Sequence, residues 1–130
     1  MRHLRVRLAA GLAVALATTL VAGAGTGAAA PSKKTVTPAP VKITVTATEF
    51  AFKFSKESIK KPGTVIFTVI NKGTIAHNLQ FKTLHKTTKM LQPKQKTVLT
   101  VKFTKKGSFY YLCTVPRHAE EGMAGSFKVL

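Results

Sequence analysis

The chain has 130 residues, one cysteine and a formal net charge of +17, from 21 Lys and Arg against four acidic residues. A single cysteine excludes an intrachain disulfide, and a positive excess of this size predicts acidic partners or an anionic surface. Sequence-specific binding of nucleic acid is not expected. Such binding uses arginines that make bidentate contacts with bases, and Arg117 is the one arginine after the N-terminal segment.

Residues 1–30 are predicted to be a secretory signal peptide. Three arginines near the start precede an uncharged stretch rich in Ala, Leu, Val and Gly. Small residues suited to cleavage occur at 22–24 and again at 26–28. The alternative is an uncleaved anchor, since the stretch is long enough to span a bilayer, although its Ala and Gly content makes a weak span. The expected location is outside the cytoplasm, in the periplasm or cell envelope or secreted, and the chain without those three arginines keeps a net charge of +14.

Residues 31–40 are predicted to be a flexible linker, because their Pro, Ser and Lys content cannot bury an apolar face. Residues 41–130 are predicted to form one small domain, in which alternation of apolar and polar residues hardly stops. A domain of this size often depends on a metal or a disulfide for stability, and the disulfide is excluded.

The alternation is that of β-strands with one face on a core, at 41–47, 50–54 and 98–103. The segment 64–70 is apolar on both faces, which predicts a central strand. The segment 83–90 lacks a two-residue period and is interpreted as a loop or a single helical turn. Many short strands of the antiparallel type separated by Pro and Gly turns predict an all-β sandwich or barrel.

The residues with the most specific chemistry are Cys113, His118 and Met123, which follow one another at a Cys-x4-His-x4-Met spacing. A thiolate, an imidazole and a thioether on one loop are a donor set that copper prefers. His77 lies just after the turn at Asn71-Lys72-Gly73, where an end of a sandwich brings it to that loop. Two histidines, one cysteine and a weak axial methionine are typical of a blue electron-transfer copper site.

Each of these residues also has an ordinary structural interpretation, as an inert buried thiol, a packing methionine or a core histidine. Zinc is the chemical rival, but methionine is a poor zinc ligand and structural zinc sites use four strong ones. Copper is therefore favoured. A transient copper site at His85 and Met90 is less favoured than exposed loop side chains, and the aromatic run 109–111 is interpreted as packing rather than an electron path.

The sequence resembles the cupredoxins, the small blue copper proteins, over most of residues 41–130. The resemblance rests on Glu49-Phe50-Ala51-Phe52, Lys61-Pro62-Gly63, Asn71-Lys72-Gly73, His77-Asn78 and the run 107–113. The spacing of the ligand loop is similar to that of auracyanin and rusticyanin. The resemblance implies a Greek-key β-sandwich or barrel, with His77, Cys113 and His118 as equatorial ligands of one copper ion and Met123 as the axial ligand. It also implies that Asn78 pins the His77 segment near Thr114 and that His118 lies at the surface as the exit for the electron.

The predicted function is a type 1 copper protein that carries single electrons, is not an enzyme and acts as a monomer with acidic redox partners. The alternatives are an extracytoplasmic copper carrier or scavenger with the same four ligands, and an adhesive protein for acidic envelope polymers. An oxidase or nitrite reductase would need more histidines than the chain offers. Lysines are spread along the sequence, so a merely solvated basic surface is as well supported as a patch dedicated to binding an acidic partner. Glu120 and Glu121 are expected to make the copper end less basic than the rest.

Overall fold

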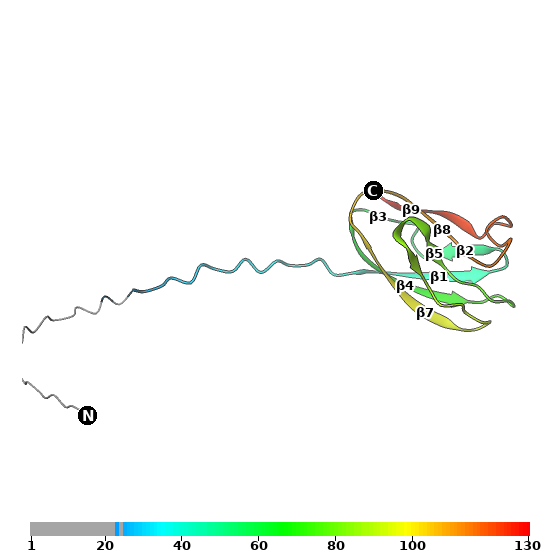
Figure 1. Ribbon diagram of the computed structural model, residues 1–130, viewed down its shortest axis with the longest axis horizontal. Coiled ribbons are helices and arrows are strands. Elements are labelled where there is room, and N and C mark those ends of the chain that lie inside the picture. Colours follow the sequence, from blue (N-terminus) through cyan, green and yellow to red (C-terminus); the bar gives the residue numbers. More distant parts are fainter. Residues whose placement is uncertain (1–22, 24) are drawn as a thin grey trace, which may run out of the picture. The chain divides into compact units, whose positions relative to one another are not determined.

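Nine strands and one short 3₁₀ helix make up the fold in the computed structural model, which describes residues 23 and 25–130 (Figure 1). The signal-peptide prediction lies mostly outside the described residues. Within residues 25–40 there is no helix or strand. Residues Thr35–Leu130 form one compact unit. Among the described residues, none belongs to a helix with the length and apolar character needed to cross a bilayer.

The first sheet has four strands in the order β2-β1-β4-β7. These strands are β1 (Val41–Thr48), β2 (Ala51–Phe54), β4 (Gly63–Asn71) and β7 (Lys96–Phe103). Strand β4 lies inside this sheet, between β1 and β7, as its apolar sequence predicts. Alternate residues of β1 and β4 are buried, so each strand turns one face to the core.

The second sheet has five strands in the order β3-β9-β8-β5-β6. These strands are β3 (Ser58–Ile59), β5 (Gln80–Phe81), β6 (Lys86–Thr87), β8 (Gly107–Leu112) and β9 (Ala124–Val129). The 3₁₀ helix η1 (Lys82–Leu84) connects β5 to β6. Of the two interpretations of segment 83–90, a loop or a single helical turn, the helical turn is therefore found at its start. The expected all-β sandwich is confirmed.

Two strand pairs are parallel, β1 with β4 and β3 with β9, so the expectation of antiparallel strands is wrong for them. The cause is the path of the chain. Strand β2 turns back along β1, the chain then adds β3 to the second sheet, and it returns to the end where β1 began. Strand β4 therefore starts beside the start of β1, and Val41 is paired with Val65.

The core between the sheets is dominated by phenylalanines. The Phe67 ring lies 5.1 Å from the Phe81 ring and 5.4 Å from the Phe127 ring, measured between centroids, and Phe103 packs on both Phe67 and Phe127. These four side chains are almost fully buried. Burial of one such side chain contributes roughly 1.5–3 kcal/mol, so this cluster provides much of the rigidity of the domain. The loops at the ends of the sandwich are built on this rigid base.

Candidate metal centre

The loop between β8 and β9 carries three of the predicted ligands and is closed by its own backbone. The Cys113 N–H donates to the Met123 carbonyl at 2.9 Å, and the Met123 N–H donates to the His118 carbonyl at 2.8 Å. Gly122 has a φ of 126°, and a Cβ at this position would approach the Phe50 carbonyl oxygen. Glycine is therefore required there, and the three ligands are fixed relative to one another without the help of a metal.

His77 reaches the same end of the sandwich from the segment between β4 and β5. It exchanges backbone hydrogen bonds with Leu91 at 3.0 and 2.8 Å. The buried Asn71 side chain donates to the carbonyls of Ile75 and Leu91, both at 2.8 Å, and its Oδ1 accepts the Gly73 N–H. The turn that the sequence indicated at 71–73 thus has a second role, because its asparagine supports the segment that carries His77. We call this end of the sandwich the ligand end.

The structure brings together the ligand atoms of His77, Cys113 and His118, all within 4.8 Å of one another. The Nδ1 atoms of His77 and His118 are 3.2 Å apart, and the Cys113 Sγ lies 3.6 Å from the His118 Nδ1. Met123 is fully buried and packs against Cys113 and Ala47. All four residues predicted from the sequence therefore meet at one buried place.

The donor set fits a copper ion. Two buried ring nitrogens that face each other at 3.2 Å require a proton or a cation between them, and one ion with bonds of about 2 Å spans that separation. Burial, followed by the proximity of His77, lowers the pKa of His118, which favours the neutral ring that coordinates metals. Cys113 would add a soft thiolate and Met123 a weak thioether, the combination that selects copper over zinc.

Glu49, in the turn between β1 and β2, is a site residue that the sequence analysis did not identify. Its Oε1 lies 3.2 Å from the His77 Nε2 and accepts the backbone N–H groups of Thr74 at 2.7 Å and Ile75 at 3.0 Å. These hydrogen bonds, with Ile75 as the largest contribution, lower the pKa of the Glu49 carboxyl to about 2. An ionised carboxylate on Nε2 holds the proton of His77 on that nitrogen and leaves Nδ1 free for a metal.

Gly73 makes room for this carboxylate, because a Cβ at this position would collide with the Glu49 side chain. The sequence indicated Gly73 as a turn residue and gave no sign of the contact. Glu49 and His77 are 28 residues apart, and only the parallel pairing of β1 with β4 brings them together.

Asn78 ties the His77 segment to the ligand loop, as the resemblance implied. Its Nδ2 donates to the Thr114 Oγ1 at 2.8 Å, and its Oδ1 accepts the Thr114 N–H at 2.8 Å. Thr114 directly follows Cys113, so this pair of hydrogen bonds fixes one ligand-bearing segment against the other. Asn78 is 6% exposed, which makes it part of the packed interior.

His118 does not lie at the surface as expected, since it is only 6% exposed. The Phe50 ring packs edge-on against it, with the ring centroids 5.0 Å apart, and Phe50 itself is 38% exposed. The Phe50 side chain therefore stands between His118 and solvent. Sequence reasoning placed Phe50 on the core face of an alternating strand, whereas β2 begins one residue later and leaves Phe50 in the turn beside Glu49.

The remaining candidates lie away from this centre. His85 ends η1, and His85 and Met90 are both exposed. The described metal-ligand group contains neither. Tyr111 packs against Phe54 with the ring centroids 4.6 Å apart, and Phe109 packs against Phe103 at 4.8 Å, in agreement with the packing interpretation. The third member of the run, Tyr110, is exposed.

Comparison with known families gives one match that covers most of the chain. The family described as copper binding proteins, plastocyanin/azurin family, matches residues 39–130. Comparison with curated proteins finds no significant match.

Several solved structures share the fold. Dithionite-reduced auracyanin from the photosynthetic bacterium Roseiflexus castenholzii superposes with a TM-score of 0.58 at 21% identity, over 72% of this chain and 99% of that one. Auracyanin A from Chloroflexus aurantiacus, a blue copper protein, superposes with a TM-score of 0.56 at 17% identity, over 71% of this chain and 100% of that one. The periplasmic domain of cytochrome oxidase subunit II from Bradyrhizobium japonicum superposes with a TM-score of 0.59 at 13% identity, over 72% of this chain and 87% of that one.

Proposed function

The chain belongs to the plastocyanin/azurin family of copper-binding proteins, and we propose that it is an exported type 1 copper protein that carries single electrons between redox partners. The observation that carries the proposal is the buried convergence of the two Nδ1 atoms and the Cys113 Sγ beside Met123. Copper bound there would supply a one-electron Cu(I)/Cu(II) couple. We assign the chain no catalytic reaction.

The chain's own contribution is to hold the ligands still. His77 is fixed by Glu49 on one side and by its Leu91 backbone pairing on the other. The backbones of Cys113 and His118 are both hydrogen-bonded to the backbone of Met123, which accepts from the Cys113 N–H and donates to the His118 carbonyl. A donor set that is already assembled and excluded from water changes little between the two charge states, so little structural reorganisation accompanies electron transfer.

The expected exit for the electron passes through His118 and the Phe50 ring. Phe50 is in edge contact with the His118 ring and reaches the surface at the ligand end. A partner docked on this end would approach the centre without displacing any ligand. An extracytoplasmic location is supported by the N-terminal sequence and by the structural likeness to a periplasmic oxidase domain.

A copper carrier with the same ligands is the alternative, and burial argues against it. A carrier must let an acceptor reach the metal, but the exposed fractions of the four side chains lie between 0% and 6%. Rapid transfer of copper to a chelating acceptor, without electron exchange, would favour the carrier over the proposal.

The experiment is a titration of the purified protein with Cu(II), followed by visible absorption and electron paramagnetic resonance. We expect an intense blue band from charge transfer between thiolate and copper, at one copper per chain. Cys113→Ser should abolish the band and His77→Ala should weaken or shift it. His85→Ala is the matched control, because it removes an exposed histidine and should leave the spectrum unchanged. A colourless wild-type complex would overturn the proposal.

A further inference from the structure

Lysines gather at the end of the sandwich opposite the copper ligands, although they are spread along the sequence. Strand register places this end where β1 and β4 begin and where β7 and β9 finish. In Figure 1 it is the end marked by the C terminus, away from the loop between β8 and β9. We call it the lysine end, and define it by eight exposed side chains: Lys42, Lys56, Lys60, Lys61, Lys102, Lys105, Lys106 and Lys128.

The acidic groups have the reverse distribution. Glu49, Glu120 and Glu121 lie at the ligand end, where Arg117 pairs with Glu121 at 3.6 Å. At the lysine end the acidic side chain is Glu57, whose carbonyl accepts the Lys128 N–H. The ligand end also carries cations, among them Lys72, Lys94, Lys96 and Arg117, so both ends of the domain are positive. The excess of cations over carboxylates is nevertheless larger at the lysine end.

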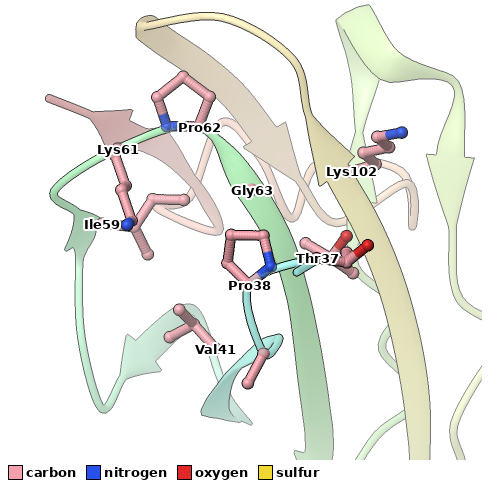
Figure 2. Close-up of a pocket in the computed structure, with 10 residues that line it drawn as sticks. Thr37, Pro38, Val41, Ile59, Lys61, Pro62, Gly63 and Lys102 are labelled. Atoms are coloured by element: carbon pink, nitrogen blue, oxygen red, sulfur yellow. The ribbon is translucent and has the colours of Figure 1, made fainter. Parts of the chain in front are cut away.

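The lysine end also has an apolar component. A crevice of about 170 Å³ is lined by Pro38, Val41, Ile59 and Pro62, with Lys61 and Lys102 among its walls (Figure 2). A second hollow next to it is lined by Val41, Ile59, Lys60, Lys61 and Leu130, and Leu130 is 56% exposed. Cationic side chains thus surround apolar ones on the same face.

The chain enters the domain at this end. Residues 37–39 line the crevice together with Val41, the first residue of β1. Residues 37–39 thus lie at the lysine end of the domain and not at the ligand end.

We propose that the lysine end binds the surface of an anionic lipid bilayer. The lysines meet the phosphates of the headgroups, and the exposed Leu130 side chain meets the apolar boundary beneath them. A soluble polyanion or an acidic polymer offers charge but no apolar layer, so the bilayer matches both features of the face. In this orientation the ligand end points away from the membrane and stays open to redox partners.

The test uses vesicles and the copper-loaded protein as purified from the exported fraction. Binding is measured by co-sedimentation with vesicles of phosphatidylglycerol and phosphatidylcholine, and with phosphatidylcholine vesicles alone. We expect binding to the anionic vesicles only, lost at high ionic strength. Each lysine near an anionic surface contributes about fivefold to the affinity, so removal of three should weaken binding roughly 100-fold.

Two triple variants of equal net charge separate a defined face from overall charge. The first, Lys60→Gln with Lys61→Gln and Lys102→Gln, should show the full loss. The control, Lys72→Gln with Lys94→Gln and Lys96→Gln, changes lysines of the ligand end and should bind almost as the wild type does. The blue band and the melting temperature verify that both variants are folded.

Equal losses in the two triple variants would show that charge acts diffusely and would overturn the proposal. So would binding to a soluble polyanion such as polyglutamate without binding to anionic vesicles. Leu130→Ser tests the apolar component, and it should weaken vesicle binding while leaving polyglutamate binding unchanged. These results do not depend on electron transfer, so the proposed function and this inference can fail separately.

Discussion

Removal of the Asn78 side chain is expected to weaken the joint between the two ligand-bearing segments without removing a ligand. Asn78→Ala deletes the donor to the Thr114 Oγ1 and the acceptor for the Thr114 N–H, each at 2.8 Å. The backbone of Thr114 directly follows Cys113, so the loop loses its side-chain link to the His77 segment. The hydrophobic core is not touched by this change.

The size of the effect follows from burial. A buried polar group left without a partner costs about 1–3 kcal/mol. Asn78 is 6% exposed, but Thr114 is exposed, so water can reach the orphaned N–H from one side. We therefore expect a loss in the lower part of the range, about 1–2 kcal/mol. In a domain of this size that corresponds to a melting temperature lower by roughly 5–15 °C. Copper affinity should fall about tenfold, because partners of a ligand segment orient the ligands.

The assay is thermal unfolding of the apo and copper-loaded proteins, together with a competition titration for copper affinity. Gln80→Ala is the matched control, since the Gln80 amide lies two residues further along the chain and bonds to Thr87 at an exposed position. Its effect should stay below about 0.5 kcal/mol. Thr114→Val should cost less than Asn78→Ala, because it keeps the hydrogen bond from the Thr114 N–H. An unchanged melting temperature and unchanged copper affinity in Asn78→Ala would refute the reasoning.

Three further predictions concern tuning and partners. Met123→Leu should retain copper and colour and raise the reduction potential measured by voltammetry, because loss of a weak axial donor destabilises mainly Cu(II); loss of copper would show that Met123 is a primary ligand. Glu49→Gln should also raise the potential, because it removes a negative charge hydrogen-bonded to His77, whereas Glu121→Gln at the same end should change it little. Electron exchange with an acidic redox protein, followed by stopped flow, should slow steeply as salt rises, whereas exchange with a neutral small reductant should not; a rate independent of salt would argue against electrostatic steering.

The strands and the ligand set were accessible from sequence because both depend on local pattern. Period-two alternation identifies a half-buried strand wherever one face packs on a core, and β1 and β7 follow that rule residue by residue. Cys113, His118 and Met123 lie within one loop, so their spacing alone predicts a site for a metal that prefers soft ligands. His77 was found because it follows a turn that ends a buried strand.

The contacts that the sequence did not reveal are long-range and involve ordinary residue types. Glu49 reaches His77 through a parallel strand pair, and the prediction of antiparallel strands gave no reason to join them. The Gly73 position depends on the carboxylate of Glu49 and not on its own backbone. The Phe50 ring packs on His118 because Phe50 lies in a turn, and the alternation of apolar and polar residues does not show where that turn ends and β2 begins. Each of these features is set by tertiary packing.

The distribution of charge follows from the same topology and connects the two ends of the molecule. The ligand end combines a carboxylate that supports a histidine with a loop that carries Glu120 and Glu121. Eight of the lysines lie at the opposite end of the sheets, where Glu57 is the acidic side chain. A field that is stronger at one end than at the other orients the whole domain before contact, whether the anionic surface is a protein or a bilayer. Reversal of the charge of Lys60 and Lys61 should therefore change orientation and surface binding while the spectrum of the copper site stays the same.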